Sequence, residues 1–303
     1  MLLPAPLRSA LLVACSLLAV NGCGGSGEEA PGETVSEPVA ASPAVNTDVA
    51  ATVTTYGDHA SQFVHTWRPQ GGQRRLPVMV LIHGGFWRDR FALDLMEPLA
   101  ADLVARGWVA VNMEYRRLGE LDTGWPMLLT DVAAALDSVP EVLADLGIEA
   151  TTVVVTGHSA GGQLALWAGA RHLLPAGAPG AGPVLRPDAV IGLAAVSDLH
   201  AAAALGLSGS VVLDLLGGPP SQVPDRYDHT SPASLVPTGS RQLLVHGDRD
   251  DVVPATMSAT YADKAAAAGD PVELITDPSA DHFTVIDPGS VLWARTLEAL
   301  DAG

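Results

Sequence analysis

The stretch at residues 151–171, TTVVVTGHSAGGQLALWAGAR, constrains the fold more than any other part of the chain. It opens with five consecutive β-branched residues, which predict a strand buried on both faces. GHSAGG follows at 157–162, and the apolar residues beyond it have helical spacing: Leu164, Leu166, Trp167 and Ala170. A fully buried strand that turns tightly into a helix is typical of a parallel sheet covered by helices.

The turn itself carries a G-x-S-x-G pattern, with Gly157 and Gly161 on either side of Ser159. In this strand–turn–helix context the pattern predicts a nucleophile elbow, because glycines allow a strained turn and a close approach of helix to strand. The helix N-terminus beneath the serine favours negative charge. We therefore expect Ser159 to be a nucleophile and His158 to line the substrate pocket. The alternative is an ordinary turn in a chain rich in Gly, Ser and Ala.

The rest of the chain alternates between strand and helix patterns. Strands are predicted at 62–67, 78–82, 108–113, 189–196, 241–246 and 272–275, and helices at 95–104, 126–143, 254–268 and 290–299. This order predicts an α/β domain over residues 49–303, with a mainly parallel, twisted sheet and helices on both faces. The largest insertion, 197–240, has room for a crossover with one helix near 208–216, so we expect no large lid domain.

The first 48 residues have a different composition. Arg8 precedes an apolar stretch, which predicts a signal peptide, and VNGC at 20–23 resembles a bacterial lipobox. We expect a lipoprotein-type signal peptide at 1–22, a lipidated Cys23 and a disordered Gly/Ser/Glu/Pro-rich tether at 23–48. The protein would then be exported to the cell envelope and anchored to the membrane by lipid. The alternatives are lipidation at Cys15, plain secretion or an uncleaved leader.

Charge and cysteine content narrow the possible partners. With 16 basic and 34 acidic residues, the net charge of −18 argues against nucleic acid and against anionic membrane surfaces. The domain contains neither cysteine, so it has no disulfide and no thiolate metal site. The histidines lack metal-binding spacing, and we expect neither a metal nor a cofactor. The predicted partner is a small-molecule ester, and the sequence leaves the oligomeric state open.

A serine hydroxyl becomes nucleophilic only when a base takes its proton and an acid orients that base. The acidic cluster Asp248, Asp250 and Asp251 follows the predicted strand 241–246, and His282 follows the strand 272–275. Carboxyl ends of parallel strands meet at one edge of the sheet, where open α/β sheets have their sites. We expect Asp250 to be the acid, with Asp251 in reserve, and His282 the base. The alternative is that these residues are ordinary surface-loop residues.

The reaction also needs hydrogen-bond donors for a developing oxyanion. HGGFW at 83–87 ends a predicted strand, and its glycines let the backbone approach a substrate. We expect the N–H groups of Gly85, Phe86 and Ala160 to form the oxyanion hole. His83 would brace this loop and Trp87 would wall the acyl pocket. A tight strand-to-helix turn without this role is the alternative.

Taken with GHSAGG, the segments HGGFW, HGDRDDVVP and DHF resemble the α/β-hydrolase superfamily. Within it the chain is similar to the kynurenine formamidase (arylformamidase) and carboxylesterase branch, which includes bacterial feruloyl and acetyl esterases. The resemblance implies the α/β-hydrolase fold and a Ser159–Asp250–His282 triad. Formamidases usually carry Tyr where this chain has Phe86, and they work inside cells, so both departures favour an esterase.

The sequence therefore predicts a serine carboxylesterase that cleaves short-acyl or aryl carboxylic esters through an acyl-enzyme. The rival enzyme is an N-formyl arylamide hydrolase of the kynurenine formamidase type. A third possibility is a non-catalytic surface protein with the same fold, although such proteins typically lose a triad member and this chain retains all three.

Overall fold

The computed structural model describes residues 50–120 and 123–302, all within the unit Ser42–Gly303. Its sheet has eight strands: β1 (Thr52–Thr55), β2 (Phe63–Trp67), β3 (Arg75–Ile82), β4 (Val109–Met113), β5 (Glu149–His158), β6 (Ala189–Leu193), β7 (Arg241–Gly247) and β8 (Val272–Asp277). The α-helices are α1 (Glu97–Ala105), α2 (Met127–Asp145), α3 (Ala160–Ala170), α4 (Leu199–Leu205), α5 (Val211–Leu216), α6 (Pro224–Thr230), α7 (Thr256–Ala268) and α8 (Val291–Asp301). Four short 3₁₀ helices lie between them.

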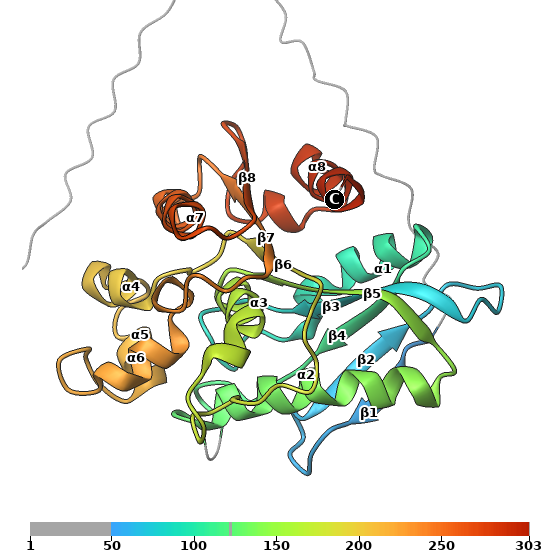
Figure 1. The fold of residues 1–303 in the computed structure, drawn as a ribbon, viewed down its shortest axis with the longest axis horizontal. Coiled ribbons are helices and arrows are strands. Elements are labelled where there is room, and N and C mark those ends of the chain that lie inside the picture. Colours follow the sequence, from blue (N-terminus) through green and yellow to red (C-terminus); the bar gives the residue numbers. More distant parts are fainter. Residues whose placement is uncertain (1–49, 121–122, 303) are drawn as a thin grey trace, which may run out of the picture. The chain divides into compact units, whose positions relative to one another are not determined.

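The strand order is β1-β2-β4-β3-β5-β6-β7-β8, and every neighbouring pair from β4 to β8 is parallel. Only the pairs β1–β2 and β2–β4 are antiparallel. The chain moves from β3 outward to β4 and then returns to the other side of β3 with β5 (Figure 1). This reversal is the place where open α/β sheets bind ligands at their carboxyl edge.

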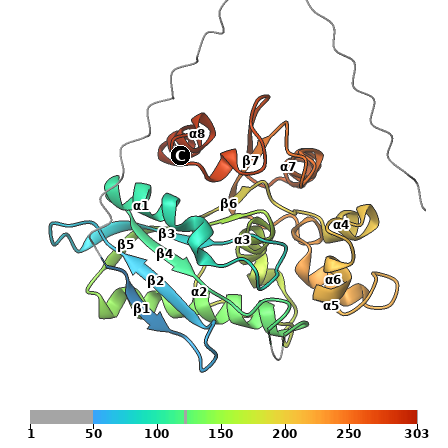
Figure 2. The same ribbon diagram turned by 180° about the vertical axis from the view of Figure 1, so that it is seen from behind.

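Two hydrophobic clusters fill the two faces of the sheet, and β3 contributes to both because its side chains alternate. Val78, Val80 and Ile82 pack with residues of α2 and α3. Met79 and Leu81 pack with residues of α1 and α8 on the opposite face. Figures 1 and 2 show α2 and the pair α1 and α8 on opposite sides of the sheet. The mainly parallel sheet with helices on both faces is thus confirmed.

The structure corrects the predicted elements in three places. The short strand β1 was not predicted, because its TVTT sequence is polar and mostly exposed. β6 ends at Leu193 and not at residue 196, since Ala194 has a left-handed φ of 48°. The insertion at 197–240 holds α4, α5 and α6 where one helix was expected. Asp198 caps α4 by accepting hydrogen bonds from the N–H groups of His200 and Ala201.

The sequence predictions for Cys15, Cys23 and the rest of residues 1–49 lie outside the described residues. In the described ranges, no helix is long and apolar enough to cross a membrane.

Candidate active site

Ser159 occupies the sharp turn between β5 and α3. Its φ of 56° and ψ of −116° lie outside the conformations that a serine prefers, a strain of about 1–3 kcal/mol that surrounding contacts must hold. Those contacts come from the end of β6. The Ser159 N–H donates to the Leu193 carbonyl at 2.8 Å, and its carbonyl accepts from the Val196 N–H at 3.2 Å. The left-handed Ala194 turns the chain between these two partners.

The glycines around Ser159 are required by close backbone approach. A Cβ at Gly161 would collide with the carbonyl oxygens of Ile82 and His83, at the end of β3. A Cβ at Gly84 would lie 2.7 Å from the His158 carbonyl oxygen and 3.0 Å from Ser159 Cβ. The HGG loop therefore lies directly against the serine.

The loops after β7 and β8 bring Asp250 and His282 together. His282 Nδ1 lies 2.6 Å from Asp250 Oδ2, and the carboxylate side chain is fully buried. An ionised carboxylate only accepts, so Nδ1 carries the proton and Nε2 keeps a free lone pair for a base. Asp248 and Asp251, the two neighbouring acids, are exposed.

The Asp250 carboxylate is held as an anion by donors on both oxygens. Oδ1 accepts from the N–H groups of Val252 and Val253 at 2.9 and 2.8 Å. Oδ2 accepts from His282 and also lies 3.0 Å from Nε2 of His246. Burial alone would raise the pKa of Asp250, but the hydrogen bonds from the two histidines and Val253 outweigh it and hold that pKa well below its usual range.

His158, the residue before Ser159, contacts His282. Its Nε2–H donates to the His282 carbonyl at 2.9 Å, and the two rings are 4.6 Å apart. Burial lowers the pKa of His158 to about 3, with a smaller contribution from repulsion by His282 when that ring is protonated, so His158 is neutral at pH 7. Among the described residues, Ser159 Oγ makes no hydrogen bond to His282. Such bonds are often long without substrate and tighten in the Michaelis complex.

Three backbone N–H groups are available for an oxyanion: those of Gly85, Phe86 and Ala160. In the part of the chain that the structure describes, none of them is bonded to a protein acceptor. Ala160 is the first residue of α3, whose leading N–H groups have no partner within the helix. Gly85 and Phe86 have left-handed φ values of 108° and 52°. Trp87 is buried, and its indole N–H donates to Gln163 Oε1 at 3.2 Å.

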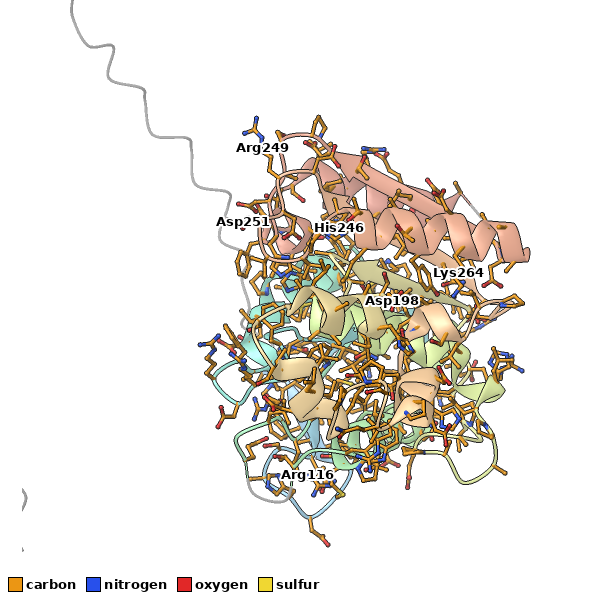
Figure 3. The ribbon with its side chains drawn as sticks, turned by 90° about the vertical axis from the view of Figure 1, so that its left-hand side faces the viewer. Arg116, Asp198, His246, Arg249, Asp251 and Lys264 are labelled. Carbon is orange, nitrogen blue, oxygen red and sulfur yellow. The ribbon has the colours of Figure 1, made fainter. Side chains whose placement is uncertain are left out.

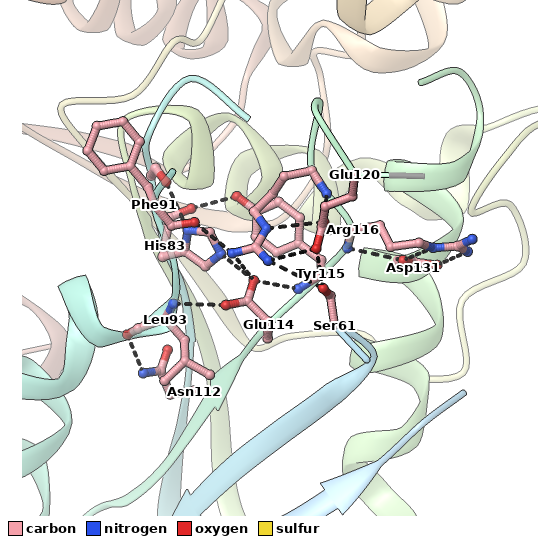
Figure 4. A network of polar contacts seen from close by, with 12 residues as sticks. Ser61, His83, Phe91, Leu93, Asn112, Glu114, Tyr115, Arg116, Glu120 and Asp131 are labelled. Atoms are coloured by element: carbon pink, nitrogen blue, oxygen red, sulfur yellow. Dashed lines mark hydrogen bonds and ion pairs between the residues drawn. The ribbon is translucent and has the colours of Figure 1, made fainter. Parts of the chain in front are cut away.

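A buried polar network holds the HGG loop from behind (Figure 4). His83 Nδ1 donates to the Gly84 carbonyl at 2.8 Å, and its Nε2 lies 2.9 Å from Glu114 Oε1. Because C=O and N–H of a trans peptide point in opposite directions, the bond to Gly84 turns the Gly85 N–H the other way. Glu114 also accepts from the N–H groups of Leu93 and Tyr115 at 3.1 and 3.0 Å.

Sequence reasoning missed two residues of this region, Glu114 and His246. Glu114 directly follows the strand predicted at 108–113, and His246 is the last residue of the strand predicted at 241–246. A signal was present in both cases, since each is a polar residue at the carboxyl end of an apolar strand, where a buried side chain needs a partner. Within residues 50–120 and 123–302, no group of His, Cys, Asp or Glu is arranged to hold a metal ion.

Comparison of the sequence with known protein families gives a match. The model of the BD-FAE family matches residues 65–265, a span that includes Ser159 and Asp250. The chain belongs to the BD-FAE family. The matched residues run along the chain from β2 to β7 and include the helices between these strands, whereas His282 lies beyond them.

Sequence relatives of this BD-FAE protein include two esterases of Mycobacterium tuberculosis. It is 29% identical to esterase LipQ over 69% of its own length and 50% of LipQ. It is 26% identical to esterase LipC over 77% of its own length and 59% of LipC. The chain thus spans about half the length of the curated relatives that it matches.

Solved structures share the fold at lower identity. A truncated carbohydrate esterase from gut microbiota superposes with a TM-score of 0.72 at 21% identity, covering 84% of this chain and 97% of that one. The esterase Est2 of Thermogutta terrifontis, solved with butyrate bound, gives a TM-score of 0.67 at 22% identity, covering 84% and 93%. The α/β-hydrolase fold is therefore confirmed.

Proposed function

We propose that this BD-FAE protein is a serine carboxylesterase that cleaves short-acyl or aryl carboxylic esters. The observation that carries the proposal is the strained Ser159 between β5 and α3, on the same sheet edge as the 2.6 Å Asp250–His282 pair. A strained serine with free backbone donors beside it suits acyl transfer more than packing. The esterase names of LipQ and LipC support the same reaction.

In the proposed mechanism, Ser159 Oγ attacks the ester carbonyl while His282 Nε2 takes its proton. Asp250 orients the imidazole and stabilises its cationic form. The N–H groups of Gly85, Phe86 and Ala160 bind the oxyanion of the tetrahedral intermediate. His282 then protonates the leaving alcohol, and a water molecule activated by the same imidazole hydrolyses the acyl-enzyme. The proposal requires no metal and no cofactor.

The test is a series of p-nitrophenyl esters of increasing chain length, measured with the wild type and Ser159→Ala. We expect kcat/KM to peak at acetate to butyrate and to fall by octanoate, since α4, α5 and α6 have only six or seven residues each and offer little surface to bury a long acyl chain. The butyrate bound to Est2 has the chain length of the longest acyl group in this expected range, acetate to butyrate. Ser159→Ala should abolish turnover and leave the melting curve nearly unchanged. Wild-type turnover in Ser159→Ala would refute the mechanism. A maximum of kcat/KM at decanoate would refute the short acyl pocket.

The same assay distinguishes the rival substrate class. An N-formyl arylamide hydrolase would turn over N-formyl aniline faster than an aryl acetate, whereas we expect the reverse order. A non-catalytic surface protein would show no turnover that depends on Ser159.

We also propose export to the cell envelope and lipidation at Cys23. This part of the proposal rests on the apolar leader and the VNGC segment alone.

A further inference from the structure

His246 is a buried histidine that the proposed mechanism does not use. It is the second-last residue of β7, and its side chain is fully shielded from solvent. Figure 3 shows it inside the fold, beneath the loop that carries Arg249 and Asp251, with the Arg249 side chain pointing away from it. A polar ring at such a position must satisfy both nitrogens within the protein.

The partners of His246 fix its tautomer. Nε2 lies 3.0 Å from Asp250 Oδ2 and 3.0 Å from the Val253 carbonyl oxygen. A carbonyl and an ionised carboxylate only accept, so Nε2 carries the proton. Its N–H is shared between these two acceptors. Nδ1 lies 2.7 Å from Ser258 Oγ on α7, and the Ser258 hydroxyl donates to it. The ring therefore presents one donor, and that donor faces Asp250.

Asp250 Oδ2 thus accepts from two imidazoles, His246 on β7 and His282 on the loop after β8. The second oxygen is occupied by the N–H groups of Val252 and Val253. With its side chain fully buried, the carboxylate has no solvent to turn toward. If His246 were absent, Oδ2 would keep only the His282 donor, and rotation of the carboxylate would be opposed only through the two N–H groups on Oδ1.

We propose that His246 is a positioning residue for Asp250: its Nε2–H holds the carboxylate in the orientation in which Oδ2 receives the Nδ1–H of His282. This inference rests on the proposed function, because it assigns His246 a role in aligning the proposed base. His246 itself does not touch the reacting atoms.

The experiment compares three substitutions of His246 in the full chain, with a p-nitrophenyl butyrate assay and a thermal melt for each. His246→Leu removes the donor while filling the site. His246→Gln can place an amide N–H near the former Nε2, and His246→Asn is too short to reach Asp250. Ser258→Ala is the matched control, because it removes a buried partner of the same ring without removing the Nε2–H donor.

We expect His246→Leu and His246→Asn to lower kcat about 10- to 100-fold, the usual effect of losing a hydrogen bond to a charged group. KM should stay within about twofold. His246→Gln should recover most of kcat, and Ser258→Ala should stay within about threefold of the wild type. If His246→Leu does not fold, the comparison of His246→Gln with His246→Asn decides.

Two results would overturn the inference: an unchanged kcat in His246→Asn or in a folded His246→Leu, or an equal fall in Ser258→Ala, which would indicate packing. Failure of the proposed function looks different. In that case the wild type would show no turnover that Ser159→Ala abolishes, whatever the residue at 246.

Discussion

At the scale of single residues, the candidate site depends on which of several similar side chains the backbone turns inward. Three acids lie within four residues after β7, and only Asp250 points its carboxylate into the protein. Sequence order could predict Ser159, an acid in this cluster and His282, because the chemistry needs those residue types at strand ends. It did not predict Glu114, whose partners His83 and Leu93 come from another segment. It did not predict His246 either, because the turn that brings Asp250 back onto the ring four residues later has no periodic signal in the sequence.

The choice among the acids can be tested directly. We expect Asp250→Asn to lower kcat by about 10³–10⁴-fold, since an amide can favour the wrong imidazole tautomer. Asp248→Asn and Asp251→Asn, which change exposed carboxylates, should each stay within about twofold of the wild type, and steady-state kinetics on p-nitrophenyl acetate measures all three. A larger loss in Asp251→Asn than in Asp250→Asn would contradict the assignment.

At the scale of elements, the central strands and long helices could be predicted because their apolar periodicity is strong. β3, β4, β5, β7 and β8 all overlap the predicted segments. Elements without that signal were missed: β1 is polar, and α4 reads LHAAAAL, with too few large apolar residues to show a face. The strand order could not be derived either, since it is set by pairing between strands far apart in sequence.

The junction of α3 with β3 offers a test at this scale. Gly161→Ala would push a methyl group into the backbone carbonyls of Ile82 and His83, and we expect it to destabilise the fold by about 1–3 kcal/mol. A Cβ at Gly169 on the same helix would lie 3.1 and 3.3 Å from the Val190 methyl groups and 3.6 Å from Ser240 Cβ, with no backbone atom as close, so Gly169→Ala should destabilise the fold less. Denaturant unfolding measures both. Equal stability of the two variants would show that the close approach is not limiting.

At the scale of the whole molecule, composition limits which partners and which kinds of site the protein can have. The net charge of −18 argues against nucleic acid as a partner, and the absence of cysteine from 24–303 excludes a disulfide and a thiolate metal site there. Both conclusions hold whatever the order of the strands. The boundary between tether and domain near residue 49 was predicted from the loss of periodicity in a Gly/Pro/Glu-rich segment. The described residues begin at 50, so the tether stays a prediction.

The proposed anchor can be tested by metabolic labelling with a fatty acid in a bacterial host. We expect label in the wild type and none in Cys23→Ser, because a bacterial lipoprotein carries its acyl chains on that cysteine. Several acyl chains give stable attachment where one chain gives only marginal binding. Loss of label in Cys15→Ser instead would move the processing site, and label in both variants would contradict Cys23 as the only lipidated residue.

The arrangement in which strands and helices carry the core while strand-end loops carry the chemistry has an evolutionary consequence. Exposed residues of the loops after β3, β6 and β7 can be substituted while the buried residues of the same loops, such as Trp87 and Val253, stay in the core. Substitutions of this kind would change the surface around Ser159 and leave the scaffold intact, and proteins only 21–22% identical to this chain share its fold with TM-scores of 0.67–0.72. A shared fold therefore does not identify the substrate of this chain.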